Sequence, residues 1–289
     1  MSAVRFGQLL RTIPDTWRLL PEMPAIDLAR LRKQANRLAD FFFLPDDFRR
    51  LLRETLDFYV NRTLRRSQSV APGSNLPTYR TPNEILRQIE VNLGPLAREN
   101  PHYALELADM LWDEGYLETR LLAAFLLGCI PAQEERLLAR LTAWAQQVRD
   151  PSVRSALLTT SLTRMREETP DQFLVLIGEW LHPARQRMWS SGLQALLPMV
   201  RNPDYENLPP IFALTRPIIE SAPTTLQTEI GDLINALFSN SAQETVFFLH
   251  EIIDGSTNPM IIINLRRLLP FFPPTLQAQL REKVRAKRS

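Results

Sequence analysis

Three arginines recur at nearly equal spacing in the middle of the chain and have the chemistry to bind phosphate. They are 34 and 33 residues apart, at Arg120, Arg154 and Arg187. Arginine offers a planar pair of N–H donors that fits phosphate and carboxylate oxygens. In a protein of stacked repeats this spacing predicts a row of guanidinium groups, which could follow a nucleic-acid backbone without reading its bases. The alternative is a structural row, in which the arginines form ion pairs between neighbouring repeats.

One aspartate next to the middle arginine is the candidate catalytic residue. Asp150 stands directly before Pro151 and four residues before Arg154. It could cap the helix that begins at Pro151, because an aspartate side chain accepts hydrogen bonds from the first backbone N–H groups. It could also pair with Arg154, or stabilise a positive charge that develops during a reaction. Capping and pairing are the simpler explanations.

Tryptophan side chains are the candidates for contacts with flat rings. Trp112 lies on an apolar stripe with Leu105 and is predicted to be buried. The tryptophans that are better placed for an exposed concave surface are Trp144, Trp180 and Trp189. Of these, Trp144 and Trp189 are predicted to contribute to nucleic-acid binding, since aromatic faces attract cations and flat bases.

The sequence contains no pattern for a metal or cofactor site. The histidines lack a His, Cys or Glu partner at metal-ligand spacing, so no zinc site is predicted at His102, His182 or His250. A glycine-rich phosphate loop and a G-x-S-x-G motif are also absent from the sequence. Nucleotide-dependent and serine-hydrolase activities are therefore not expected, and no cofactor is expected either.

Helical hairpins are the elements that must position these residues. In residues 103–130, Leu105, Ala108 and Leu111 form an apolar stripe of helical period, and Gly115 is predicted to end that helix. A second helix, from Leu117 to about residue 129, is apolar almost all round and should be buried on more than one side. It should end before residue 131, a proline.

Similar second helices begin near residues 117, 151, 183, 223 and 259, and four of the five open with proline. Their partner helices are predicted at about 103–114, 132–148, 171–181, 205–220 and 241–254. A repeated two-helix unit of 32 to 40 residues predicts an all-α fold, a right-handed α-solenoid. The segment Asp150-Pro151-Ser152-Val153-Arg154 resembles the start of the second helix in HEAT repeats, where an Asp and an Arg usually join neighbouring repeats.

The chain divides into three predicted regions. Residues 1–66 form an N-terminal helical extension with a short helix, a helix from about 26 to 43 and another from 45 to 66. Residues 67–81 are rich in Ser, Pro and Gly and are predicted to be a linker. Residues 82–289 form the HEAT-like repeat region, which opens with a helix to about Arg98 and closes with a capping helix at 275–285.

Composition sets the broad class. Of 34 basic residues 31 are arginine, the formal net charge is +2, and the single cysteine allows no internal disulfide. No apolar run approaches the roughly 20 residues that span a bilayer, and the N-terminus lacks the pattern of a signal peptide. We therefore expect a cytoplasmic protein without a membrane contact.

Residues 103–127 resemble the bacterial DNA alkylation repair (AlkD-like) glycosylases, especially around Leu111-Trp112-Asp113 and Thr119-Arg120. The helix-opening sequence YRTPNEILRQI at 79–89 is similar to the segment before this hairpin in that family. These proteins are HEAT-like solenoids that remove alkylated purines from duplex DNA. The resemblance covers about residues 79–255 and implies duplex DNA as the partner, with Arg187 close to the DNA backbone.

The sequence departs from the family at the catalytic loop. The family carries a Trp-Trp-Asp run there, whereas this chain reads Gln147-Val148-Arg149-Asp150-Pro151. A later tryptophan of the family is also missing, because residues 226–238 contain none. The leading prediction is a DNA-binding protein, in which glycosylase activity at Asp150 is left open. The competing prediction is a protein–protein scaffold that binds a protein segment in its concave groove.

Overall fold

The structure, a computed structural model, describes residues 27–60, 74–255 and 258–286. These residues form helices and connecting turns without a strand, so the all-α prediction is confirmed. The helices of the first half are α1 (Leu28–Asp40), α2 (Pro45–Phe58), α3 (Asn83–Glu99), α4 (Pro101–Asp113), α5 (Leu117–Leu127), α6 (Glu135–Gln147), α7 (Pro151–Thr159) and α8 (Thr163–Glu168). Those of the second half are α9 (Pro170–Leu181), α10 (Trp189–Val200), α11 (Pro209–Ser221), α12 (Gln227–Asn240), α13 (Ala242–Gly255), α14 (Pro259–Leu268) and α15 (Pro274–Ala286).

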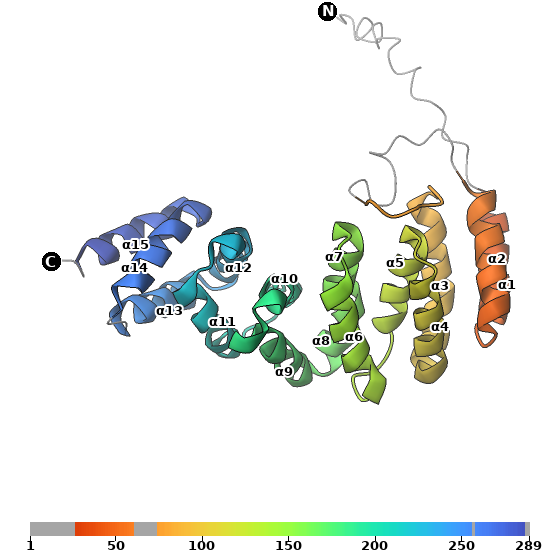
Figure 1. Cartoon of the computed structure of the whole chain (residues 1–289), viewed down its shortest axis with the longest axis horizontal. Helices are drawn as coiled ribbons and strands as arrows, with labels where there is room; N and C mark the ends of the chain where they lie inside the picture. Colours follow the sequence, from red (N-terminus) through yellow and green to blue (C-terminus); the bar gives the residue numbers. More distant parts are fainter. Residues whose placement is uncertain (1–26, 61–73, 256–257, 287–289) are drawn as a thin grey trace, which may run out of the picture.

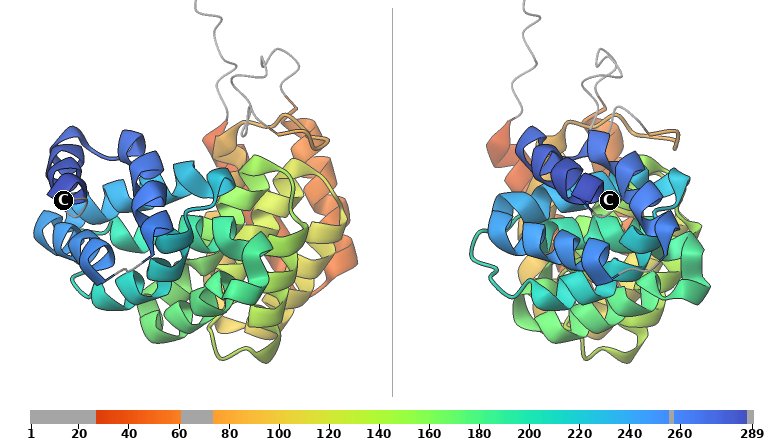
Figure 2. Two further views of the ribbon diagram at one scale, coloured as in Figure 1. Left: turned by 60° about the vertical axis from the view of Figure 1, so that its left-hand side comes forward. Right: turned by 90° about the vertical axis from the view of Figure 1, so that its left-hand side faces the viewer.

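The helices follow one another along a curved row from α1 to α15 (Figure 1). One chain of contacts runs from α3 through α5, α7, α10 and α12 to α14. On the other side of the row, α9 contacts α11, α11 contacts α13, and α13 contacts α15. Figure 2, left, shows the two ends of this row far apart, with α1 at one end and the C-terminal helices at the other.

Glycine and proline end and begin the helices where the sequence predicts. Gly115 follows α4 with a φ of 76°, a conformation that is inexpensive only for glycine. Pro151 and Pro259 are the first residues of α7 and α14, where their missing N–H costs nothing. Pro183 opens the 3₁₀-helix η4 (Pro183–Met188), and Pro223 stands directly before η5 (Thr224–Leu226).

In the second unit the predicted second helix begins at Pro151, as expected, but it is short and ends at Thr159. After α7 the chain makes the 3₁₀-turn η3 (Thr160–Leu162) and then the separate helix α8. The turn packs tightly on α5: Ser161 Oγ donates to the carbonyl of Ala124 at 2.8 Å. A Cβ on Gly128 would lie only 2.2 Å from the Thr160 carbonyl oxygen. This close approach explains why α7 ends at Thr159 and η3 follows it. Sequence periodicity does not reveal such a contact.

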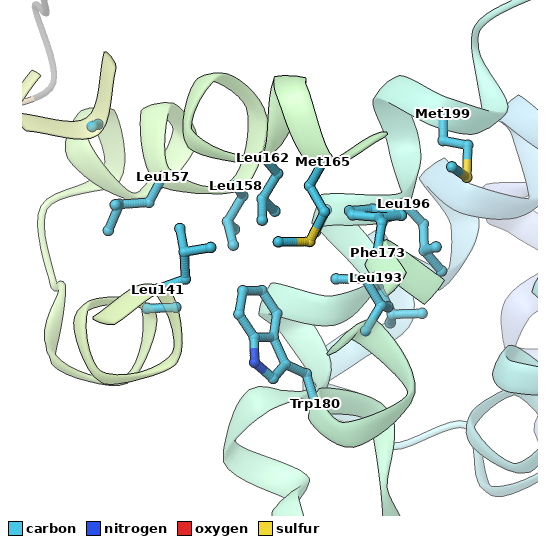
Figure 3. Close-up of a cluster of buried hydrophobic side chains, with 14 of the residues drawn as sticks. Leu141, Leu157, Leu158, Leu162, Met165, Phe173, Trp180, Leu193, Leu196 and Met199 are labelled. Atoms are coloured by element: carbon cyan, nitrogen blue, oxygen red, sulfur yellow. The ribbon is translucent and has the colours of Figure 1, made fainter. Parts of the chain in front are cut away.

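A cluster of buried side chains joins the two halves of the row where the helices change direction. Figure 3 shows Leu158 of α7, Met165 of α8 and Trp180 of α9 pointing into one apolar cluster. The Trp180 side chain is 0% exposed, and its indole N–H donates to Thr142 Oγ1 of α6 at 3.0 Å. Burial of each such side chain contributes roughly 1.5–3 kcal/mol to stability. The change of direction between the two halves of the row is therefore held by a well-packed apolar cluster.

The first helices add another layer to the end of the row. Helix α1 contacts α3, and α2 contacts α4. Arg53 of α2 forms an ion pair of 2.7 Å with Glu114, which follows α4. Helix α2 ends at Phe58; residues 61–66, where it was predicted to continue, and the short helix predicted before residue 26 lie outside the described residues. None of the helices that the structure describes is both long and apolar enough to cross a bilayer.

Candidate nucleic-acid interface

Asp150 is the N-cap of α7, as one of its predicted roles requires. Its Oδ1 accepts hydrogen bonds from the backbone N–H groups of Ser152 and Val153 at 3.0 and 3.1 Å. Its Oδ2 accepts from Ser74 Oγ at 2.7 Å and from the Asn75 N–H at 3.0 Å. Both carboxylate oxygens are therefore occupied, and the residue is 6% exposed.

These hydrogen bonds also determine the charge of Asp150. Burial alone would raise the pKa of this carboxyl, but the four donors, Ser74 first among them, together lower the pKa below its usual value. Each donor stabilises the ionised form. Asp150 is therefore a buried, ionised carboxylate at neutral pH.

The donors Ser74 and Asn75 belong to a segment that we call the strap, residues 74–80. The strap crosses the starts of two helices, because Thr78 Oγ1 and the Tyr79 N–H donate to Glu118 of α5 at 2.6 and 3.1 Å. Glu118 is 0% exposed. This part of the predicted linker is thus bound to α5 and α7 through two buried carboxylates.

Arg154 does not pair with Asp150, so of the two predicted alternatives the structure shows the helix cap and not the ion pair. Instead, the Arg154 Nη2 donates to Ser191 Oγ of α10 at 3.1 Å. The reason is that the strap and the start of α7 already saturate the Asp150 oxygens. Arg154 does join neighbouring helix layers, but through a hydroxyl, so its charge is not neutralised by the contact.

Arg154 lies in a groove of about 1280 Å³ between the α6–α7 turn and η4. Four arginines line this arginine groove, and no carboxylate does: Arg149, Arg154, Arg185 and Arg187. Glutamines 146, 147 and 186 add uncharged hydrogen-bonding groups. The structure therefore brings Arg154 and Arg187 together, as the sequence predicts.

The charges in the groove are largely uncompensated. Within the described part of the chain, Arg149, Arg154 and Arg187 form no ion pair, and Arg185 lies 3.6 Å from Glu179. Burial lowers the pKa of Arg154 and outweighs the opposite effect of Glu229. Its buried Nε has no hydrogen-bond partner among the described residues. A partly buried guanidinium is best stabilised by an anion that accepts hydrogen bonds from two of its N–H groups, and the groove offers room for such an anion.

Arg120 does not line this groove. Its guanidinium lies over the Trp112 ring, 4.9 Å from the ring centre, and its Nε is 3.4 Å from the Trp112 carbonyl oxygen. Trp112 in turn stacks face to face on Trp144, with centroids 4.1 Å apart and planes inclined by 6°. Arg120 thus covers a tryptophan pair between α4 and α6, and the predicted row of three arginines is reduced to two.

The prediction of exposed tryptophans is wrong. Trp144, Trp180 and Trp189 are 4%, 0% and 6% exposed, and the Trp189 indole N–H donates to the His182 carbonyl at 3.1 Å. Trp112 is 7% exposed, as expected for a core residue. Their apolar rings fill the space between helix layers, so none of these four indoles is available to a base.

Sequence reasoning missed Arg149 and Arg185. Arg149 stands two residues before Pro151, and Arg185 stands two residues after Pro183; both prolines open second helices. Arg185 interrupts η4 with a φ of −113° and a ψ of 43°, so its side chain departs from the helical direction of its neighbours. A position within two residues of a helix-opening proline was the available signal, since such turns lie together along one edge of stacked hairpins.

No cluster of three or more His, Cys, Asp or Glu side chains suited to a metal occurs among the residues that the structure describes. The groups that the structure brings together here are the cations and amides of the groove and, at the start of α7, the capped carboxylate of Asp150.

Comparison with known families finds one that matches most of the chain. The profile of the family described as DNA alkylation repair enzyme matches residues 76–262. This match covers more than half of the 289 residues, and the chain belongs to that family. No curated protein and no solved structure matches the chain.

Proposed function

We propose that the protein binds duplex DNA through the arginine groove and contacts the phosphate backbone without reading base sequence. The observation that carries the proposal is the set of four arginines, without a carboxylate, in one groove of about 1280 Å³. Phosphate contacts supply most of the affinity of such binding. Membership of the DNA alkylation repair enzyme family supports DNA as the source of the phosphates.

We propose that the architecture is a right-handed solenoid of HEAT-like repeats over residues 82–289, preceded by a linker and an N-terminal helical extension. The contact chain from α3 to α14 supports this, because each second helix packs on the next. The contacts of α1 with α3 and of α2 with α4 support an extension that packs on the end of this solenoid.

The proposal does not include base excision. Asp150, the candidate catalytic residue, has both oxygens engaged by four hydrogen bonds. The tryptophans that could surround an alkylated base are buried. Release of an alkylated purine from duplex DNA by the wild type, with loss of that release in Asp150→Asn, would contradict this part of the proposal.

The test measures binding to a labelled duplex of random sequence at a series of salt concentrations, with fluorescence anisotropy as the readout. We expect the logarithm of the affinity to fall by about 0.9 per phosphate contact for each tenfold increase in salt. Arg187 is exposed, so Arg187→Ala should remove about one contact from this slope and leave the unfolding midpoint unchanged.

The matched control is Arg32→Ala, which removes an exposed arginine of α1 at the far end of the row. It should leave the slope as in the wild type. Equal slopes for Arg187→Ala and the wild type, or no binding at low salt, would overturn the proposal. If the protein bound no duplex at low salt, the competing prediction would be favoured, in which the arginine groove binds an acidic protein segment.

A further inference from the structure

A second groove lies between α11 and α13, away from the arginines. Its volume is about 540 Å³, and its apolar lining comes from Pro209, Phe212, Ala213, Phe247 and Phe248. The Phe212 and Phe248 rings stack with centroids 4.5 Å apart and form the base of the groove. Phe247 projects beside them and is 65% exposed. Exposed apolar surface gathered in this way is typical of an interaction site.

Charged groups of both signs surround the apolar centre. On α11, Arg216 uses its Nε to bind Glu220 at 3.0 Å and also lines the groove. On α13, Glu244 and Glu251 stand one turn before and one turn after Phe247, and neither forms an ion pair within the described part of the chain. The rim thus carries one guanidinium on one helix and two carboxylates on the other.

The two helices run side by side in the same direction. Phe212 stacks on Phe248, and one turn later the Arg216 Nη2 lies 3.6 Å from the position that a Cβ on Gly255 would take. Glu251 is therefore at the Arg216 end of the groove, and Glu244 is at the Pro209 end. This order decides how a second copy can fit.

We propose that the face formed by α11 and α13 binds the same face of a second copy of this chain. In a two-fold interface each residue meets its counterpart reciprocally. A two-fold axis parallel to the helices lays α11 of one copy over α13 of the other. Arg216 then meets Glu251 of the partner subunit, and the reverse contact forms on the other side of the axis.

A two-fold axis could also lie in the plane of the interface but perpendicular to the helices, and electrostatics disfavours that second arrangement. A two-fold axis perpendicular to the helices would place Glu251 against Glu244 of the partner subunit, two carboxylates with no cation between them. The parallel axis pairs opposite charges twice and stacks Phe212, Phe247 and Phe248 of both copies at the centre. An aromatic centre with a charged rim is the usual composition of a stable interface.

The inference goes beyond DNA binding, because no residue of the arginine groove lies in this face. The first test is the mass of the full-length chain over a concentration series, by sedimentation or light scattering. We expect a dimer, and we expect Phe247→Glu to weaken dimerisation by at least about 30-fold, as for a central aromatic anchor. The control is Val91→Glu on α3, because Val91 is 69% exposed but lies outside both grooves. It should dimerise as the wild type does.

The second test exchanges charges and identifies the pairing. Arg216→Glu alone and Glu251→Arg alone each place like charges opposite each other twice, so each should be monomeric where the wild type is dimeric. Mixed in equal amounts, the two variants should form a heterodimer, because both cross-contacts are then again between opposite charges. Circular dichroism of each variant confirms that it is folded. A wild type that is monomeric at every concentration, or a mixture that stays monomeric, would overturn the proposal.

Discussion

Asp150 is held by groups that are distant in the sequence, and this decides what it can do. Ser74 and Asn75 are 76 and 75 residues away from it, yet they occupy one carboxylate oxygen, while the start of α7 occupies the other. A carboxylate saturated in this way stabilises structure, since the fold favours its charged form. It therefore fastens the strap to α7.

Replacement of Asp150 by asparagine should destabilise the protein by about 1–3 kcal/mol at neutral pH. The amide can still cap α7, but its NH₂ group would face the Ser74 hydroxyl and the Asn75 N–H, which both donate to the carboxylate. Chemical denaturation at pH 7 measures the difference, and an unchanged free energy of unfolding would contradict the bonding described.

The pH dependence of that difference has a definite sign. Because the folded pKa of Asp150 is lowered, the stabilisation is complete above the unfolded pKa of about 3.9. It is lost as pH falls through the folded pKa. The wild type and Asp150→Asn should therefore converge in stability as the solution is made strongly acidic. A gap that widens on acidification would exclude this origin.

The sequence predicted part of the site at this scale and missed the rest for physical reasons. Arg154 and Arg187 could be recognised as neighbours from their repeat positions, because stacked units bring equivalent residues together. The partner of Asp150 could not be recognised, since the strap that reaches it has no periodic pattern. The tryptophans were placed on the surface because a sequence does not show how a second layer of helices covers an indole.

At the scale of elements, the boundary between α7 and α8 depends on one glycine. Gly128 lets the Thr160 carbonyl approach α5 to a distance at which a Cβ would be 2.2 Å away. The prolines and Gly115 determine helix ends through local backbone geometry, so these helix boundaries could be predicted from the sequence alone. The turn η3 depends on contact between residues 32 apart in the sequence, so helical periodicity could not reveal where α7 ends.

Gly128→Ala should destabilise the protein by roughly 1–3 kcal/mol, because its Cβ would meet a backbone oxygen that cannot move without shifting η3. Gly94→Ala is the matched control, since a Cβ at Gly94 in α3 would lie 3.5 Å from the Phe125 ring, an ordinary contact. That change should be neutral or stabilise by up to about 1 kcal/mol, as expected inside a helix. Thermal unfolding of the two variants gives the comparison. Similar melting temperatures would show that η3 is not held in this way.

At the scale of the whole molecule, the arginine groove and the α11–α13 face lie on different parts of the row. A dimer formed through that face would therefore carry two arginine grooves. On a DNA long enough to reach both, the second contact would be intramolecular, and its effective concentration would raise the apparent affinity. On a short duplex only one groove could bind.

Phe247→Glu should thus leave affinity for a short duplex unchanged and weaken binding to a long duplex by tenfold or more, since linked sites commonly gain about 10²–10⁴. Anisotropy with duplexes of the two lengths, at one salt concentration, measures both affinities. Val91→Glu should match the wild type on both. If Phe247→Glu weakened binding to short and long DNA equally, Phe247 would affect the arginine groove itself. If the variant bound long DNA as tightly as the wild type does, the two arginine grooves would act independently.

The parallel stack of Trp112 on Trp144 has an optical consequence. Two indoles with centroids 4.1 Å apart and planes inclined by 6° are close enough for their electronic transitions to couple. Where the transition dipoles of two stacked rings are rotated relative to each other, this coupling produces paired circular-dichroism bands of opposite sign, which a single indole does not show. Because one ring comes from α4 and the other from α6, these bands report whether the two layers remain in contact. The near-ultraviolet circular dichroism of the protein can therefore be used to monitor whether α6 stays packed on α4.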